Sequence, residues 1–347
     1  MKQKASILFL ARLYHPHIGG VEKHVAEISK LLIGKGYKVT ILTELYEKKL
    51  KRKELIDGVT VIRIPVGTNQ FLKKFLIWRW IFLNIFFVCS FDIIHVHDVF
   101  FWLLPVRPLL FWKKMYVTFH GYEDYPIKKR WIAIRKVTEM TVNGSICIGK
   151  FMKKWYFASP TYVNYGGARL KSINAAENGM GAVFFGRLEN QTGIMQYVQA
   201  FKEIKEKYPE FTLTVVGDGP LAKKLPKNIT QKPFTQDVLT YIAKNKYVFV
   251  SRYLSMIEAL GMGKTVIAVY DNPIKKDYLL MSPFKKYVNV FNEPDEIANF
   301  IYSCLRKENK KENDEAVRWA KSQTWEKVLA TYLSLWGQSQ KKLLDNR

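Results

Sequence analysis

The sequence predicts an α/β protein built from two doubly wound domains that face a cleft. Strand-like and helix-like segments alternate along both halves of the chain, which is the pattern of parallel sheets covered by helices. Near the start, a strand at 7–10, a glycine turn, a helix at 21–34 and a strand at 37–43 form a βαβ unit. The length of 347 residues suits two domains of ordinary size.

The first half alternates buried strands with helices up to a linker. Short apolar runs bounded by polar residues are typical of strands covered on both faces. The expected strands are residues 7–10, 37–43, 59–64, 93–97, 115–119 and 145–148. The expected helices are residues 21–34, 71–91, 128–141 and a short one from Lys150. Residues 48–53 are expected to form a basic loop, and residues 160–172 the linker.

The second half repeats this alternation. The expected strands are residues 181–186, 212–216, 247–250 and 265–269. The expected helices are residues 194–207, 237–244, one that opens near Ser255, 294–307 and 325–344. We therefore expect one domain over 1–168, a second over 169–324, and a closing helix within 325–347.

The chain is strongly basic, with a net charge of +25 and 14% aromatic residues. Such a high positive charge implies a polyanionic partner, and the aromatic content favours an anionic membrane surface. Nucleic acid is not expected, because the lysines are scattered in pairs and no reading motif is present. The longest uncharged run of the segment 71–91 is 12 residues, against the ~20 that span a bilayer. This segment is expected to be either an interfacial helix or a helix that covers a sheet.

The three cysteines, Cys89, Cys147 and Cys304, are far apart and include no C-x-x-C pair. This argues against a disulfide framework and structural zinc, and it suits a reducing compartment. The first residues lead directly into a strand and do not resemble a signal peptide. A cytoplasmic location is therefore expected.

Glu258 is a single carboxylate in an apolar helix between two strands. An acid in such a place needs a strong partner, because carboxylates are almost never buried alone. If the helix opens near Ser255, Glu258 lies in the first turn, where the helix dipole stabilises it. The alternative is that Glu258 binds hydroxyl groups of a ligand at this strand-to-helix turn.

All six histidines lie in the first 120 residues, several directly after predicted strands. Open α/β sheets bind ligands at that edge. His95 and His97 share one strand face, but with only Asp98 beside them they lack the partners of a metal site. His120 precedes a glycine at a strand end, so its imidazole either points into the cleft or has a structural role.

Glycines and one arginine also follow predicted strands. Gly19 and Gly20 precede a helix and leave backbone N–H groups open to an anion. Arg187 follows Gly186 at a strand end, where a guanidinium can bind phosphate in bidentate fashion. An ion pair at the surface or between domains is the alternative role for Arg187. Gly217 begins a tight turn after the next strand.

Six short motifs occur in order along the chain: HPHIGGVEKH (15–24), DIIHVHD (92–98), TFHGYE (118–123), FFGRLENQTG (184–193), LTVVGDGP (213–220) and IEALGMGKTVIA (257–268). The segment TWEKVLATYL (324–333) follows them. Together they resemble the GT-B glycosyltransferases, specifically the retaining glycosyltransferase family 4. The resemblance covers nearly the whole chain. It implies an acceptor-binding Rossmann-like domain (1–168), a nucleotide-sugar-binding one (169–324) and a last helix (325–347) that crosses back to the first domain.

The resemblance also implies roles for individual residues. Glu258 matches a glutamate that holds the ribose hydroxyls, and Arg187 matches the cation on the donor diphosphate. His120 matches a histidine beside the transferred sugar, so His120 and Arg187 are the expected catalytic residues. The residues expected to bind the donor are Gly19, Gly20, Arg187, Gly217, Ser255, Met256, Ile257 and Glu258. The resemblance implies no metal and no cofactor.

Two positions depart from the family pattern. Thr192 stands where the family usually has a lysine, and Val250 stands where it usually has a second glutamate, eight positions before Glu258. The turn between Val250 and Ser255 also looks shortened. Arg252 in that turn is a possible compensating cation.

The implied function is retaining transfer of a hexose from a UDP- or GDP-sugar to a lipid-linked or cell-surface glycan acceptor. It would take place at the inner face of the cell membrane. One alternative is a degenerate GT-B protein without activity. Another is a nucleotide-sugar epimerase or a phosphorylase on the same fold, and a third is a nucleic-acid-binding module suggested by charge alone.

Overall fold

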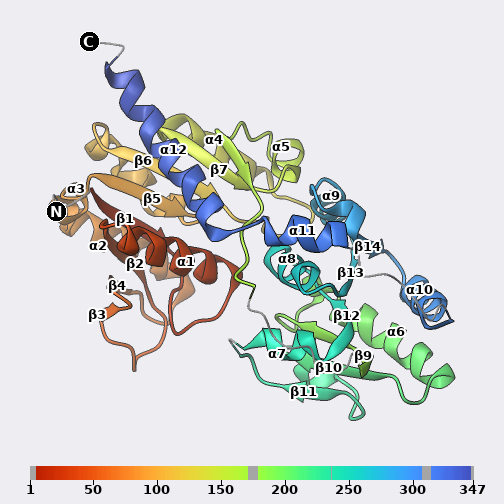
Figure 1. Ribbon diagram of the computed structural model, residues 1–347. Coiled ribbons are helices and arrows are strands. Elements are labelled where there is room, and N and C mark those ends of the chain that lie inside the picture. Colours follow the sequence, from red (N-terminus) through yellow and green to blue (C-terminus); the bar gives the residue numbers. More distant parts are fainter. Residues whose placement is uncertain (1–4, 171–178, 236, 307–313, 345–347) are drawn as a thin grey trace. The chain divides into compact units, whose positions relative to one another are not determined.

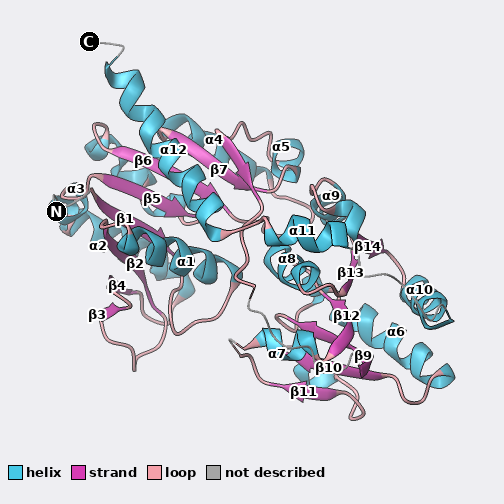
Figure 2. Ribbon diagram, viewed as in Figure 1, coloured by secondary structure: helices cyan, strands magenta, loops and turns pink. Residues whose placement is uncertain are grey.

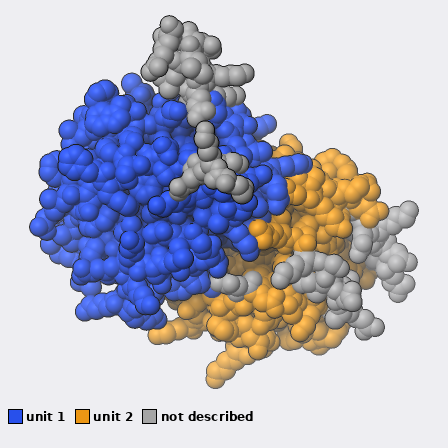
Figure 3. All heavy atoms as spheres, turned by 60° about the vertical axis from the view of Figure 1, so that its left-hand side comes forward, with its two compact units in different colours: residues 1–164, 325–347 blue, residues 165–324 orange. Residues whose placement is uncertain are grey.

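The computed structural model describes residues 5–170, 179–235, 237–306 and 314–344. The fold is α/β, with two mainly parallel sheets flanked by helices, as the sequence predicts (Figures 1 and 2). The chain divides into two compact units, which Figure 3 colours separately. Unit 1 comprises residues 1–164 and 325–347, and unit 2 comprises residues 165–324. The first boundary therefore follows residue 164, against residue 168 expected from the sequence.

Unit 1 contains an eight-stranded sheet in the order β3-β4-β2-β1-β5-β6-β7-β8. The strands are β1 (Ser6–Ala11), β2 (Lys38–Leu45), β3 (Lys53–Ile56), β4 (Val59–Pro65), β5 (Ile93–His97), β6 (Lys114–Phe119), β7 (Gly144–Ile148) and β8 (Tyr162–Asn164). The described pairings are parallel except that of β3 with β4. The order reverses at β1, which pairs with β2 on one side and β5 on the other. Ligands of open parallel sheets bind outside the carboxyl ends of the strands at such a reversal.

Helices cover both faces of this sheet. They are α1 (Gly20–Gly34), α2 (Gln70–Leu83), α3 (Ile85–Cys89), η1 (Phe100–Trp102), η2 (Leu104–Leu110), α4 (Lys129–Thr141), α5 (Phe151–Trp155) and α12 (Trp325–Leu344). Right-handed crossovers place α1 on one face and α2 with α4 on the other. The last helix, α12, packs beside α1 and crosses the sheet of unit 1 (Figure 1). Among the described residues, no helix is long and apolar enough to cross a membrane.

The structure corrects three expectations for unit 1. The single helix expected at 71–91 is two helices, α2 and α3, because Asn84 interrupts it. The Asn84 side chain donates to the carbonyl oxygen of Trp80 at 2.8 Å, so it competes with the helical backbone. The basic segment after residue 48 ends in an unexpected strand, β3. The expected linker at 160–172 contains strand β8, which pairs with β7, and Ser172 lies outside the described residues.

Unit 2 contains a six-stranded sheet in the order β11-β10-β9-β12-β13-β14. The strands are β9 (Gly179–Phe185), β10 (Thr212–Val216), β11 (Thr230–Lys232), β12 (Asn245–Phe249), β13 (Thr265–Val269) and β14 (Val288–Phe291). All described pairings are parallel. The first strand, β9, lies between β10 and β12, so the order reverses between β9 and β12.

The helices of unit 2 are α6 (Ile194–Lys207), α7 (Val238–Ala243), α8 (Tyr253–Gly261), α9 (Pro273–Leu280), α10 (Pro294–Arg306) and α11 (Asp314–Lys321). Three short 3₁₀ turns accompany them: η3 (Asn190–Thr192), η4 (Ala222–Lys224) and η5 (Lys285–Tyr287). Helices α6 and α10 pack together, and their buried side chains join those of β9, β10 and β12 in one core. Tyr197 and Phe249 stack inside it, with ring centroids 4.6 Å apart. This core fixes the positions of the carboxyl ends of β9, β10 and β12.

Candidate functional site

In unit 2, the predicted residues Arg187 and Gly217 and the turn that carries Arg252 follow strands that are neighbours in the sheet. Gly186 and Arg187 follow β9, Gly217 follows β10, and Ser251 and Arg252 come shortly after β12. These three strands are adjacent and parallel, so their carboxyl ends share one edge. The edge lies at the reversal of strand order, where open α/β sheets bind ligands.

Two glycines allow the loops after β9 and β10 to meet backbone to backbone. A Cβ atom on Gly217 would lie 2.0 Å from the carbonyl oxygen of Gly186, a distance that no side chain permits. Next to them, the N–H of Leu188 donates to the carbonyl oxygen of Asp218 at 2.8 Å. The N–H of Gly217 itself donates to Lys232 at 3.0 Å, so Gly217 supports the loop rather than offering a free donor.

The guanidinium of Arg187 lies at the surface of this edge. Its Nη1 atom is 3.4 Å from Oε1 of Glu189, and the Arg187 side chain is 55% exposed. An exposed ion pair of this kind contributes little to stability. Arg187 therefore forms a surface ion pair, which is the alternative role that the sequence suggested. Its guanidinium remains accessible to solvent.

Thr192 stands where the family usually has a lysine. The side chain is buried, and its hydroxyl donates to the carbonyl oxygen of Glu189 at 2.7 Å, within the turn that leads into α6. Gly193 follows in the left-handed region, at φ 72°. Thr192 thus serves the turn and brings no cation to it.

Glu258 lies in the second half of α8. That helix begins at Tyr253 rather than near Ser255, so it has no acidic residue in its first turn. The interpretation of Glu258 as an acid stabilised by the first turn is therefore wrong. Glu258 is only 5% exposed, and the neighbouring Met256 and Ile257 are fully buried. A bound nucleotide sugar could contact Met256 and Ile257 only through their backbone atoms, whereas the Ser255 side chain is partly exposed.

The shortened turn before α8 is tied to α9 by residues that the sequence analysis missed. Lys275 is 1% exposed, and its Nζ donates to the carbonyl oxygen of Ser251 and, at 2.8 Å, to the Ser251 hydroxyl. Burial lowers the pKa of Lys275 well below its ordinary value. The rings of Tyr253 and Tyr278 stack with centroids 3.9 Å apart, and the Tyr278 hydroxyl accepts the N–H of Tyr253. A lysine two residues after Asn272-Pro273 gives no local signal of such burial.

In unit 1, His120 comes directly after β6 and is held from two sides. Its backbone N–H donates to Oδ1 of Asp98 at 2.8 Å, and its Nε2 lies 3.0 Å from Nδ1 of His97. Burial lowers the pKa of His120 to about 3 and raises the pKa of Asp98 to about 6. The His120 side chain remains partly exposed.

A chain of hydrogen bonds joins α12 to the strands behind His120. The indole Nε1 of Trp336 donates to Nδ1 of His95 at 3.2 Å, and Nε2 of His95 lies 2.8 Å from the Thr118 hydroxyl. The Thr118 and Tyr332 hydroxyls are 2.9 Å apart, and Nε2 of His24 lies 2.9 Å from the Tyr332 hydroxyl. Tyr332 and Trp336 come from the other end of the sequence, so spacing alone could not reveal them.

The loop after His120 is fixed by a buried arginine. Nη2 of Arg135 donates to the carbonyl oxygen of Gly121 at 2.6 Å and to Oε1 of Glu123 at 2.9 Å. The Arg135 guanidinium lies 3.8 Å from the centre of the Tyr156 ring. The backbone on both sides of His120 is therefore restrained by charge-assisted hydrogen bonds.

The first turn of α1 carries an acid, Glu22, beside the predicted glycines. A Cβ atom on Gly19 would lie 2.2 Å from Oε2 of Glu22, so the Glu22 carboxylate lies directly against Gly19. Oε1 of Glu22 is 3.2 Å from Nδ1 of His17. No atom lies within 4 Å of the corresponding position on Gly20. A phosphate approaching this loop would meet the charge of Glu22.

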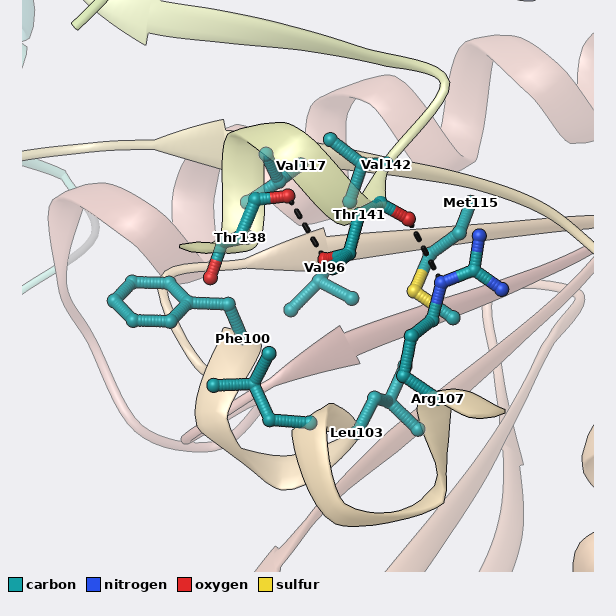
Figure 4. A pocket seen from close by; sticks show the side chains of 10 residues that line it. Val96, Phe100, Leu103, Arg107, Met115, Val117, Thr138, Thr141 and Val142 are labelled. Atoms are coloured by element: carbon teal, nitrogen blue, oxygen red, sulfur yellow. Dashed lines mark hydrogen bonds between the residues drawn. The ribbon is translucent and has the colours of Figure 1, made fainter. Parts of the chain in front are cut away.

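The metal and cavity findings do not add to this site. Among the described residues, no group of three or more His, Cys, Asp or Glu side chains is arranged to hold a metal ion. Figure 4 shows a small cavity between η1, η2 and α4, closed at one side by Arg107, whose Nε donates to the carbonyl oxygen of Thr141 at 2.7 Å. Its volume of about 10 Å³ is room for about one water molecule.

Two family models match the chain. The model described as Glycosyltransferase Family 4 matches residues 18–158, and the model described as Glycosyl transferases group 1 matches residues 180–301. Together they cover well over half of the chain, and they include both sheet edges described above. This chain belongs to glycosyltransferase family 4 (group 1). It is a glycosyltransferase enzyme, with the GT-B fold that the sequence predicts.

Relatives of this glycosyltransferase support the assignment. The gpi3 subunit of phosphatidylinositol N-acetylglucosaminyltransferase from Schizosaccharomyces pombe is 24% identical over 65% of the chain, and the chain spans about half of that subunit (53%). An uncharacterized glycosyltransferase of Methanocaldococcus jannaschii is 23% identical over 93% of the chain and 95% of its own length.

Solved structures share the fold. A sucrose-phosphate synthase from Thermosynechococcus elongatus superimposes with a TM-score of 0.75 at 15% identity, covering 99% of this chain and 100% of that one. An Anabaena protein in complex with UDP and glucose gives a TM-score of 0.64 at 15% identity, covering 99% and 100%. At such identities the likeness concerns the fold alone.

Proposed function

We propose that this glycosyltransferase moves a hexose from a UDP- or GDP-sugar to a lipid-linked or cell-surface glycan acceptor, with retention of anomeric configuration and without a metal ion. The observation that carries the proposal is the shared sheet edge of unit 2. Three adjacent parallel strands end there with two close-packed glycines, an accessible guanidinium and the helix of Glu258. This combination suits a nucleoside diphosphate at the reversal of strand order.

In this proposal Arg187 neutralises the donor diphosphate. Breaking the bond between the anomeric carbon and the phosphate oxygen places negative charge on that oxygen. A cation held in advance stabilises the charge more in the transition state than in the ground state. The acceptor hydroxyl attacks the same face of the sugar and forms the new bond to the anomeric carbon. Its proton passes to the departing phosphate, so no protein base is required.

Each unit has further proposed contacts with the donor. In unit 2, Glu258 accepts the ribose hydroxyls. In unit 1, His120 contacts the transferred sugar, and Gly19 with Gly20 offers backbone N–H groups to the diphosphate. The positions of the usual lysine and first glutamate are taken by Thr192 and Val250. Sugar recognition therefore depends on the turn around Arg252, which Lys275 and Tyr278 hold against α9.

A transfer assay with a panel of UDP- and GDP-sugars tests this function. We expect hydrolysis or transfer with one of them, and NMR of the product will show an anomeric configuration equal to that of the donor. The proposal would be refuted if none of the nucleotide sugars were turned over and no UDP or GDP compound were bound. A sugar that changes its configuration while still attached to the nucleotide would instead indicate an epimerase.

We also propose that unit 1 docks on an anionic membrane at the cytoplasmic side. Six exposed aromatic side chains lie on α2, on α3 and just after η2, and α2 contacts both α3 and η2. This aromatic patch consists of Phe71, Phe75, Phe82, Phe86, Phe111 and Trp112, each at least half exposed and Phe86 88% exposed. Exposed aromatic rings on neighbouring helices are typical of a surface that binds a membrane interface.

Cations are interspersed with the aromatic patch. Lys74 and Arg79 are exposed on α2, and Nζ of Lys74 lies 4.9 Å from the centre of the Phe75 ring. The opposite side of α2 is buried through Ile77 and Ile81. The helix therefore covers the sheet with one side and presents aromatic and basic groups with the other, which is the pattern of an interfacial helix.

Co-sedimentation with lipid vesicles tests the docking. The protein is expected to bind vesicles rich in phosphatidylglycerol and to bind phosphatidylcholine vesicles far less. High salt is expected to weaken the binding to phosphatidylglycerol. Replacing Phe71, Phe75 and Phe82 by serine removes three large apolar groups and should weaken binding at least about tenfold. Met195→Ser on α6 of unit 2 is the control. Equal binding of the triple variant and the control would contradict the proposal.

A further inference from the structure

Four histidines gather in unit 1 around two aromatic residues of α12. The histidine cluster consists of His24, His95, His97 and His120, together with Tyr332 and Trp336. The rings of His95 and Tyr332 lie 4.8 Å apart, and those of His97 and Tyr332 lie 6.2 Å apart. Burial lowers the pKa of His24, His95 and His97 well below the ordinary value, so these imidazoles are neutral and each has one N–H.

The donors of the cluster point in one direction. An indole nitrogen can only donate, so Trp336 fixes Nδ1 of His95 as an acceptor and leaves the His95 proton on Nε2. That N–H donates to the Thr118 hydroxyl. The Thr118 hydroxyl then donates to Tyr332, and Tyr332 donates to Nε2 of His24. The opposite direction would leave the Thr118 hydroxyl proton without an acceptor, at the cost of an unmade hydrogen bond.

The bond between His97 and His120 also has a preferred direction. Nε2 of His97 is buried and has no hydrogen-bond partner among the described residues. A buried N–H without a partner is rarer than a buried acceptor without one. His97 therefore has its proton on Nδ1 and donates it to Nε2 of His120. His120, as the acceptor, then has its own proton on Nδ1, at the ring edge away from His97.

The His120 ring is also held by packing. The His24 ring meets it edge to face, at a centroid distance of 4.8 Å and an interplanar angle of 86°. His24 is in turn fixed by the hydroxyl of Tyr332. The helix α12 thus reaches His120 through one side chain, His24, while β5 reaches it through His97.

We propose that His97 and Tyr332 are positioning residues that hold His120 in the Nδ1–H tautomer, ready to donate a hydrogen bond to an oxygen atom of the donor sugar. His97 selects the tautomer, and Tyr332 fixes the ring orientation through His24. The proposal rests on the proposed function only in assigning the sugar as the acceptor of the Nδ1–H bond. The tautomer itself is a property of the free protein.

Long-range ¹H–¹⁵N NMR of histidine-labelled protein measures the tautomer without any substrate. We expect His120 to be protonated on Nδ1 and unprotonated on Nε2 at neutral pH. His97→Leu removes the donor and should raise the Nε2–H population of His120. His97→Asn keeps an amide N–H close to the position of Nδ1 and should preserve the wild-type tautomer. An Nε2–H tautomer in the wild type, or no change in His97→Leu, overturns the proposal.

Kinetics separate positioning from stability. Tyr332→Phe keeps the ring and removes only the hydroxyl. We expect kcat to fall on the order of tenfold with KM little changed, because the orientation of His120 affects the transition state more than the bound ground state. His97→Leu should lose at least as much, and His97→Asn should recover most of kcat. Tyr302→Phe on α10 removes a hydroxyl that donates to Glu203 at 2.8 Å, and serves as the control.

The outcomes distinguish the two proposals. If no nucleotide sugar is turned over but the His120 tautomer depends on His97 as expected, the proposed function fails and the tautomer assignment stands. If turnover occurs and His97→Leu changes the tautomer without lowering kcat, the positioning role is refuted. A Tyr332→Phe variant that loses melting temperature but keeps full kcat refutes the role of Tyr332.

Discussion

Among single residues, Arg187 is expected to matter most for turnover. Its guanidinium is accessible and its one described ion pair, with Glu189, is exposed and weak. We predict that Arg187→Ala lowers kcat about 100-fold or more, the effect of removing a group that stabilises developing negative charge. Arg187→Lys should recover only part of it, because an ammonium group cannot bind phosphate in bidentate fashion.

Steady-state kinetics with the preferred donor measure this effect, with Lys202→Ala on the exposed side of α6 as the control. Arg252→Ala is measured in parallel for donor affinity. If Arg252→Ala leaves that affinity unchanged, Arg252 does not compensate for the lysine that Thr192 replaces. Full activity of Arg187→Ala would show that the diphosphate is bound elsewhere.

Glu22 is expected to oppose donor binding. Its carboxylate lies against Gly19, where the proposed function places the diphosphate. Two like charges about 4 Å apart repel by about 1 kcal/mol in water, which corresponds to about fivefold in affinity. We predict that Glu22→Gln binds UDP or GDP several-fold more tightly, as measured by calorimetry. Weaker or equal binding would show that Glu22 lies away from the bound diphosphate.

At the scale of elements, the histidine cluster makes unit 1 sensitive to acid. An unfolded histidine binds a proton below about pH 6.5, whereas His24, His95, His97 and His120, whose pKa values are lowered by burial, stay neutral down to pH 5. The unfolded state thus binds more protons, and each histidine lowers the free energy of unfolding by about 1.4 kcal/mol per pH unit below pH 6.5. Asp98 acts oppositely: its pKa, raised to about 6, makes the folded state take up a proton between about pH 4 and 6.

We therefore predict a net loss of stability from pH 7 to pH 5, because the four histidines of the cluster outweigh one carboxyl group. Chemical denaturation at a series of pH values measures the slope. His24→Gln should reduce the slope whatever it does to stability at pH 7, and His15→Gln, at an exposed position, should not. A wild-type stability that is constant between pH 7 and pH 5 would contradict the neutral state of these histidines.

The elements that the sequence predicted best have an unambiguous apolar pattern. The helix at 194–207 and the strand at 265–269 appear with the expected bounds, because the helix has apolar residues at helical spacing throughout and the strand is an uninterrupted apolar run. The strands β8 and β11 have only three residues each, too few for a period to show. Asn84 divides the helix expected at 71–91 by a side-chain hydrogen bond, which an apolar pattern does not reveal.

Predicting the candidate site was possible only in part. Residues that directly follow strands, such as His120 and Arg187, could be named because parallel strands end at one edge. The residues that hold the site in place could not be named in this way. Trp336 bonds His95 across 241 positions of sequence, and Lys275 is buried against Ser251 by tertiary packing alone. Such contacts depend on which helix packs on which sheet, and no local pattern encodes that.

At the scale of the whole molecule, each unit has its own sheet and its own reversal of strand order. Unit 2 provides Arg187, the close-packed glycines and Glu258, and unit 1 provides the histidine cluster and the aromatic patch. The central claim is that the sheet edge of unit 2 binds a nucleoside diphosphate with the ribose on Glu258. Glu258→Gln preserves the shape of this buried side chain and removes its charge.

Calorimetric titration of the full chain with UDP and GDP, for the wild type and Glu258→Gln, tests that claim most directly. We predict that the wild type binds at least one of the two. Glu258→Gln should bind it at least about tenfold more weakly, since a hydrogen bond to a charged group contributes about 1.5–3 kcal/mol. Failure of the wild type to bind either nucleotide, or equal binding by Glu258→Gln, would contradict it.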